Sequence, residues 1–463
     1  MRPRIQPLLA AAALAALAAP PAAAQETTAD TFRQVIHIVD VVEPRDKVAV
    51  ALPDARVHTG ARPDPVLSRK ADELRAVLWD DLQYSGVFRM VPAERYARVR
   101  ETTAEKVPYD DWVAVGARFL VLVDIESQAG DLVVEGRLFE VNLNRKVILG
   151  KRYSGPLEAT RKLAHTFADA IIQQVGGEPG VCRTKIAFLS DRDSAKPPAP
   201  PRREVYVADY DGHGAQRMTA THTLNMSPEW SPDNDQLVYT SYLRGNPDLY
   251  IMPRSGGRNR LLFGRAGMNT SPAWSPDGER IAFASSAAGA SSTGAVSTGG
   301  DSEIYTIRPD GSGLTRLTHN RGIDTNPAFS PSGREIAFTS DRTGRPQIWL
   351  MSADGLDVRR LTRQGPFNDG AAWAPRGANT RVAFAGMSAG QFHIFVHTVE
   401  TGELVQLTFE GSNEAPAWSP DGRQIAFAST RGGTTDIYVM NDDGSNMRRI
   451  TRGGNNFSPA WSH

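Results

Sequence analysis

The chain has 463 residues, of which 40% are hydrophobic and 22% are charged, and its 52 basic residues balance 52 acidic ones. This length allows two or three globular domains, and the balanced charge excludes a protein that binds nucleic acid through a strongly basic surface. A single cysteine, Cys182, excludes an intrachain disulfide, and the usual habits of cysteine favour a buried, unreactive thiol.

The N-terminus has the pattern of a secretory signal peptide. Arg2 and Arg4 precede an apolar run from Leu8 to Ala19, and small residues suited to cleavage follow at Ala22 to Ala24. The apolar run is too short to span a bilayer comfortably. We therefore expect residues 1–24 to be removed on export, which leaves 50 basic and 52 acidic residues in the mature chain.

Residues 25–180 mix strand and helix patterns and predict a small α/β domain. Its first residues, Gln25 to Phe32, are polar, and we expect them to be mobile. Segments rich in β-branched residues predict strands at 35–42, 48–52, 119–125, 132–141 and 146–153. Two apolar stripes predict helices that pack against the resulting sheet, and they run from Leu67 to Leu82 and from Leu157 to Val175.

Residues 181–463 contain a repeat that stands in full as Ser-Pro-Ala-Trp-Ser-Pro-Asp-Gly from Ser271 to Gly278. The anchor aromatics of the repeat are separated by 44, 55, 44, 45 and 43 residues, and they are Trp230, Trp274, Phe329, Trp373, Trp418 and Trp461. One insertion, from about Ser286 to Gly300, explains the longer interval. Such a period predicts a β-propeller with one four-stranded blade per repeat.

The two ends of the repeat region complement each other. An incomplete unit begins near Ile186 without an anchor segment before it, and the chain ends on an anchor segment, Ser458 to Trp461, with nothing after it. If this last strand completes the first blade, six blades close into a ring without a free sheet edge. The predicted fold is therefore an α/β N-terminal domain followed by an all-β six-bladed propeller closed by the C-terminal strand.

A polar residue stands five positions before every anchor aromatic, and the six are Asn225, Asn269, Asp324, Asn368, Asn413 and Asn456. The plain explanation is that Asn and Asp occupy turn conformations there. The same residues, with the Ser286 to Gly300 insertion, would also present polar side chains around one rim of the ring. Loops on such a rigid scaffold are well placed to bind a ligand or a protein.

Motifs that suggest chemistry are weak in this sequence. Gly386 to Gly390 fits G-x-S-x-G around Ser388, but it lies in a predicted hairpin loop rather than between a strand and a helix. His393 and His397 fall in one strand and are expected to be solvated, and the Ser-Pro-Asp-Gly segments lack the ligand spacing of a calcium loop. We therefore expect no catalytic residue, no metal site and no cofactor.

The order of these features resembles the TolB family of periplasmic propeller proteins. The resemblance covers the mature chain and includes the segment Glu-Val-Tyr-Val-Ala-Asp-Tyr-Asp-Gly from Glu204 to Gly212 and the closing Pro459 to Trp461. It implies a non-enzymatic, monomeric protein of the periplasm that serves the Tol-Pal system in outer-membrane integrity and in constriction during cell division. Membrane contact would be indirect, through protein partners, and no nucleic acid would be bound.

The resemblance also implies two binding regions. The propeller mouth would bind the lipoprotein Pal, and the residues that correspond here are Met268, Asn269, Thr270, Ser271, Thr325 and Asn326. The mature N-terminus, from Gln25 to about Ile38, would bind TolA. Two other readings stay open: a propeller-bearing hydrolase and a glycan-binding propeller.

Overall fold

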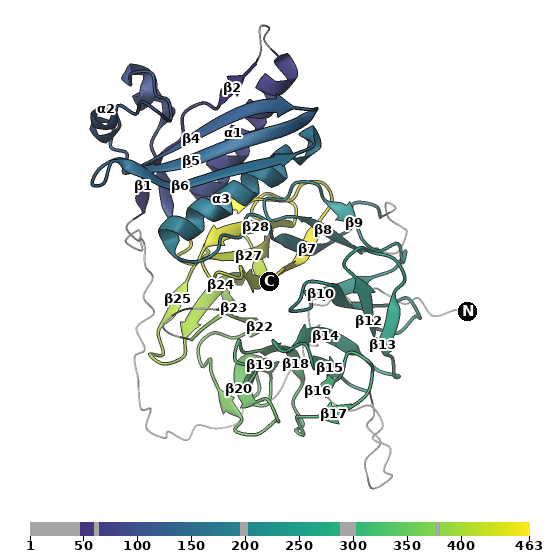
Figure 1. Ribbon diagram of the computed structural model, residues 1–463. Helices are drawn as coiled ribbons and strands as arrows, with labels where there is room; N and C mark the ends of the chain where they lie inside the picture. The colour runs from purple at the N-terminus through teal and green to yellow at the C-terminus, as the bar shows by residue number, and fades with distance from the viewer. Residues whose placement is uncertain (1–46, 60–63, 195–201, 288–301, 376, 378–379) are drawn as a thin grey trace.

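The computed structural model describes residues 47–59, 64–194, 202–287, 302–375, 377 and 380–463 (Figure 1). The expected signal peptide, the segment Gln25 to Ile38, the strand expected at 35–42 and most of the Ser286 to Gly300 insertion lie outside these residues. Within the described part of the chain, no helix combines the length and the apolar character needed to cross a bilayer.

The part of the chain before the propeller forms one mixed sheet with the order β3-β1-β4-β5-β6, and β2 pairs with β4. Pairing is parallel among β1, β2, β3 and β4 and antiparallel from β4 to β5 and from β5 to β6. The strands are β1 (Val48–Ala51), β2 (Arg56–His58), β3 (Phe88–Met90), β4 (Phe119–Gln128), β5 (Asp131–Glu140) and β6 (Lys146–Gly155).

Two long helices, α1 (Pro65–Tyr84) and α3 (Thr160–Gly176), cover one face of this sheet. The Asp64 side chain accepts hydrogen bonds from the first turn of α1, which Pro65 begins, and Gly177 ends α3 in the left-handed conformation. Shorter elements cover part of the opposite face through Trp112, and the sequence analysis did not predict them. They are η1 (Ala93–Arg98) and α2 (Tyr109–Ala114), while η2 (Leu157–Ala159) leads into α3.

The chain from Lys185 to Trp461 forms six antiparallel sheets of four strands, arranged as the blades of a ring (Figure 1). The first blade holds β30 (Asn456–Trp461), β7 (Lys185–Ser190), β8 (Glu204–Asp209) and β9 (Gln216–Arg217). The second and third hold β10 (Asn225–Trp230), β11 (Gln236–Ser241), β12 (Asp248–Pro253), β13 (Arg260–Phe263), β14 (Asn269–Trp274), β15 (Ile281–Ser285), β16 (Glu303–Ile307) and β17 (Thr315–Arg316).

The remaining three blades keep the same order along the chain. They are formed by β18 (Asp324–Phe329), β19 (Glu335–Ser340), β20 (Gln347–Ser352), β21 (Arg359–Arg360), β22 (Asn368–Trp373), β23 (Arg381–Ser388), β24 (Gln391–Thr398), β25 (Leu404–Gln406), β26 (Asn413–Trp418), β27 (Gln424–Ser429), β28 (Asp436–Asn441) and β29 (Arg448–Arg449).

The last strand closes the ring, as the sequence predicts. Strand β30 pairs antiparallel with β7, so that Trp461 stands opposite Ile186. The Trp461 indole N–H donates to the Thr184 hydroxyl at 2.8 Å, and the Trp461 side chain is almost fully buried. Because the first blade takes strands from both ends of the propeller, its pairing ties the two ends together and removes a free edge.

Paired aromatic side chains recur in the middle strands of the blades. In the blade of β10, Tyr239 lies opposite Tyr250 across the two strands, with ring centroids 6.0 Å apart. Phe384 and Phe395 repeat this contact at 5.7 Å. These cross-strand pairs explain why two aromatics eleven residues apart recur in the sequence, because each hairpin brings them face to face.

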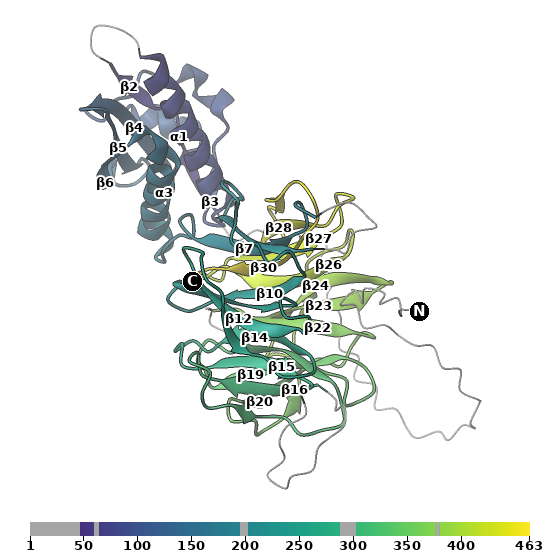
Figure 2. The ribbon, with the colours of Figure 1, turned by 90° about the vertical axis from the view of Figure 1, so that its right-hand side faces the viewer.

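The α/β domain rests on one face of the propeller (Figure 2). Gln424 donates to the Tyr84 carbonyl at 2.7 Å, and Arg423 donates to the Gly176 carbonyl at 3.1 Å. Asn446 reaches the Gln83 carbonyl at 3.5 Å. Arg423 and Gln424 lie where β26 turns into β27, and Asn446 lies in the turn between β28 and β29. Both turns are at the ends of the blade opposite to the start of its innermost strand, so the face at which the innermost strands begin stays clear of these contacts.

Candidate functional site

The mouth of the propeller is the face at which its innermost strands begin. The third residue of every innermost strand has a positive φ, from 46° to 67°, and the six are Ser227, Ser271, Asn326, Gly370, Ala415 and Ser458. The register of each strand shifts at this point, which marks a β-bulge. The bulge leaves the second and third residues of each of these strands at least partly exposed near the mouth.

The Asn or Asp that begins each of these strands is buried rather than displayed. Asn269 has no exposed surface; its amide donates to the carbonyls of Pro247 and Arg265 at 3.1 and 2.8 Å, and Ser285 donates to its carbonyl at 2.7 Å. The expectation that these six side chains line the rim is therefore wrong. They fasten the mouth loops to the blades, because a buried amide or carboxylate must satisfy its hydrogen bonds within the protein.

Two of the predicted Pal-facing residues belong to one hydrogen-bonded chain across three blades. The Ser271 hydroxyl donates to Oδ1 of the Asn326 side chain at 2.5 Å, and Nδ2 of the same side chain donates to the Asp369 carboxylate at 2.7 Å. Thr339 also donates to Asp369 at 2.7 Å. Asp369 was missed by sequence reasoning, although it has the same position in its repeat as Thr270 and Thr325.

Exposed apolar side chains surround this polar chain at the mouth. Met268, 52% exposed, directly precedes β14, and Ile323, 49% exposed, directly precedes β18. Leu243 and Phe409, 47% and 53% exposed, lie in other loops of the same face. Thr270 and Thr325 are half-buried beside them. The mouth therefore combines apolar projections with a fixed polar floor, which is an arrangement typical of protein-binding surfaces.

One innermost strand carries a carboxylate with no partner. Glu229, the fifth residue of β10, has no hydrogen bond or ion pair among the described residues, and burial raises its pKa to about 7. The other five blades have alanine at this position, namely Ala273, Ala328, Ala372, Ala417 and Ala460. Sequence reasoning missed Glu229, although the repeat itself marks it as the single acidic residue among the six equivalents.

The sequence motifs that were considered as a catalytic serine or a calcium loop have structural roles. Ser388 ends β23, and a two-residue turn with positive φ at Ala389 and Gly390 leads into β24, so the strand-turn-helix context of a nucleophile elbow is not present there. In a Ser-Pro-Asp-Gly segment, Asp277 accepts hydrogen bonds from the Ser275 hydroxyl and the Glu279 N–H, which fixes a tight turn.

The expectation that His393 and His397 are solvated is wrong. Both are buried in β24, and burial lowers the pKa of each. His393 is the third residue of β24 and lies opposite Gly386, at the position where other blades carry a buried Glu204, Glu303 or Asp436. The spacing of the two histidines therefore reflects packing inside a blade. Sequence alone could not distinguish this burial from exposure, because it depends on the neighbouring blade.

Comparison with known proteins identifies the family. The family model described as the TolB beta propeller domain matches residues 172–408 and 378–463, and that of the TolB amino-terminal domain matches residues 35–147. The chain belongs to the TolB family. A Tol-Pal system protein TolB from Desulfosudis oleivorans is 36% identical over 328 residues, which cover 68% of this chain and 58% of that protein.

Two further TolB proteins support the assignment. The Tol-Pal system protein TolB of Bordetella pertussis is 36% identical over 286 residues, covering 62% of this chain and 60% of that protein. The chain thus spans about three-fifths of the length of these two relatives. The crystal structure of TolB from Acinetobacter baumannii is 25% identical and superposes with a TM-score of 0.74, covering 90% of this chain and 97% of the other.

Proposed function

We propose that this protein is a non-enzymatic component of a Tol-Pal system in the periplasm, where it binds the lipoprotein Pal at the propeller mouth. Its relatives named Tol-Pal system protein TolB support the system, and the exposed apolar mouth supports the binding mode. The proposed contacts are Met268, Thr270, Ser271, Thr325 and Asn326. In this proposal the buried amide of Asn269 holds these residues in place without touching the partner.

The observation that carries this proposal is that the contacts between the described parts of the α/β domain and the propeller lie away from the mouth. Contacts between the two parts of the chain use turns on the opposite face, through Arg423, Gln424 and Asn446 (Figure 2). A folded partner can therefore approach the mouth without displacing the α/β domain. Large exposed apolar side chains on a rigid rim are the features that bury most favourably in a protein interface.

The proposal is tested by placing a charge on each face of the propeller. Met268→Glu puts a carboxylate into the proposed interface, and we expect it to weaken binding of the soluble domain of Pal at least tenfold in calorimetry. The matched control is Leu356→Glu, because Leu356 is 62% exposed in a turn on the opposite face. Equal weakening by both variants, or by neither, would remove the mouth from the binding site.

We further propose that Gln25 to about Ile38 binds TolA and supports outer-membrane integrity and constriction during cell division. This segment lies outside the described residues, and the proposal derives from the family alone. Deletion of Gln25 to Phe32 should abolish TolA binding and leave Pal binding unchanged. Unchanged affinity for TolA in calorimetry would reject the assignment.

Esterase and peptidase assays of the wild type and of Ser388→Ala test the alternative of a hydrolase.

A further inference from the structure

The turn that follows β8 lies at the junction between the propeller and the α/β domain. It has the sequence Asp209-Tyr210-Asp211-Gly212. Gly212 has a φ of 88°, and a β-carbon there would lie 1.8 Å from the Ile450 carbonyl oxygen. Only glycine fits so close to that backbone, and the turn is therefore held in one position.

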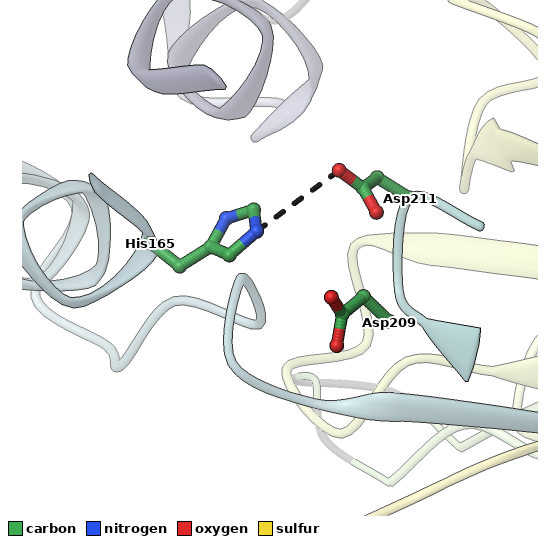
Figure 3. A group of neighbouring side chains, drawn as sticks. All are labelled: His165, Asp209 and Asp211. Atoms are coloured by element: carbon green, nitrogen blue, oxygen red, sulfur yellow. Dashed lines mark ion pairs between the residues drawn. The ribbon is translucent and has the colours of Figure 1, made fainter. Parts of the chain in front are cut away.

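This turn meets a buried histidine on α3. The Tyr210 hydroxyl donates to Asp81 on α1 at 2.6 Å, and Asp81 also holds Nδ1 of His165 at 2.8 Å. The His165 side chain is only 5% exposed. Its Nε2 atom is buried without a hydrogen-bond partner and lies 4.0 Å from Asp211 Oδ2 (Figure 3).

The arrangement around His165 is that of a metal-binding histidine. In such sites a carboxylate accepts a hydrogen bond from one ring nitrogen and leaves the lone pair of the other nitrogen for the ion. Asp81 is placed to do this for Nδ1 of His165. Nε2 then points toward two carboxylates, and the candidate ligand atoms of His165, Asp209 and Asp211 all lie within 4.8 Å of one another (Figure 3).

Both candidate carboxylates have a cationic partner in the chain. Lys185 pairs with Asp209, and Arg161 pairs with Asp211. A bound ion would compete with Lys185 and Arg161 for the two carboxylates.

We propose that His165, Asp209 and Asp211 form a site for a divalent transition-metal ion such as Zn²⁺, with water as the remaining ligand. One imidazole and two carboxylates suit ions of this class, whose bonds to nitrogen and oxygen are about 2.0–2.2 Å long. Bonds of that length in a tetrahedron separate the ligand atoms by about 3.4 Å. The site would therefore contract slightly around the ion, which small rotations of the two carboxylates allow.

A bound ion would link the α/β domain to the propeller, because its ligands come from both. His165 belongs to α3 of the α/β domain, whereas Asp209 and Asp211 belong to the propeller. An ion bound by all three would join the two parts of the chain directly. The sequence predicted no metal site, because His165 lies 44 residues before Asp209 and the three residues match no spacing motif.

The site is tested on the full mature chain by titration with ZnCl₂ in calorimetry and by metal analysis after dialysis. We expect one ion per chain, and at least tenfold weaker binding in Asp209→Asn and in Asp211→Asn. Lys185→Gln should bind the ion more tightly, because it removes the competing ammonium group. His213→Asn is the matched control, since this exposed histidine follows the turn directly and should leave binding unchanged.

Two results would overturn the proposal. The first is absence of Zn²⁺ binding by the folded wild type, which would leave an ion-pair cluster only, with His165 bridging Asp81 and Asp211. The second is binding that neither aspartate variant weakens, which would locate the ion at another histidine. Circular dichroism and thermal melting of each variant without metal establish that the fold is intact. A rise in melting temperature with Zn²⁺ that disappears in Asp211→Asn would support the site independently.

Discussion

Replacement of Glu229 by glutamine should stabilise the protein above neutral pH. The carboxylate lies in β10 with no cation or hydrogen-bond donor near it among the described residues, and burial raises its pKa from 4.5 to about 7. The folded protein therefore keeps its proton to a higher pH than the unfolded chain does. The stability from this difference is complete below pH 4.5 and is lost as the pH rises toward 7.

The size of the effect follows from the shift in pKa. A rise from 4.5 to about 7, at about 1.36 kcal/mol per unit, sets an upper limit of roughly 3 kcal/mol. Glu229 keeps partial exposure, and solvent reduces this cost, so we expect about 1–3 kcal/mol. Glutamine has nearly the same shape and no charge. Glu229→Gln should therefore exceed the wild type in stability at pH 8 and match it near pH 4.5.

Urea unfolding followed by tryptophan fluorescence at pH 4.5 and pH 8 measures this difference. The control is Glu279→Gln, which changes an exposed carboxylate in the turn after β14 and should alter stability little at either pH. A gain of the same size at both pH values would show that packing, not charge, separates the variant from the wild type. No gain at pH 8 would show that the Glu229 carboxylate is solvated or paired.

Two further predictions concern the turn at the domain junction. Gly212→Ala should lower the free energy of unfolding by more than about 2 kcal/mol, because its β-carbon would strike the Ile450 carbonyl, whereas Gly214→Ala has open space and should cost less. Tyr210→Phe should cost about 1–3 kcal/mol, because it leaves one oxygen of the buried Asp81 without its donor. Chemical unfolding measures both, and an unchanged midpoint in either case would contradict the contact concerned.

Local patterns were sufficient to predict most of the fold. The anchor Trp418 and the aromatic pairs recur because every blade repeats the same hairpin. The final anchor segment at Trp461 predicted that the last strand would close the ring. The helix from Pro65 follows from its Asp64 cap and its apolar stripe. These features depend on residues that are close together in sequence, or on a repeat that presents the same contact several times.

The candidate sites depend on contacts that no local pattern reveals. Asn269 reads as a polar loop residue, yet it is fully buried, and its partners Pro247 and Ser285 lie 22 and 16 residues away in sequence. His165 acquires its role only when α1 brings Asp81 to it, 84 residues away in sequence. Whether a polar side chain faces solvent or fastens two elements together is decided by such distant packing.

The six blades offer a comparison within a single molecule that separates scaffold from site. Where all six have a similar residue in one environment, as with the buried Asn or Asp that starts each innermost strand, the ring itself requires the residue. Where the residue in one blade differs from its equivalents in the others, the architecture of the ring does not explain that residue. The second residue of the innermost strand varies between blades and is acidic only at Asp369 and Glu414, and Glu229 replaces the alanine of the other five blades at an energetic cost. These departures are where binding should be sought first, because a cost to stability persists most readily at a functional position.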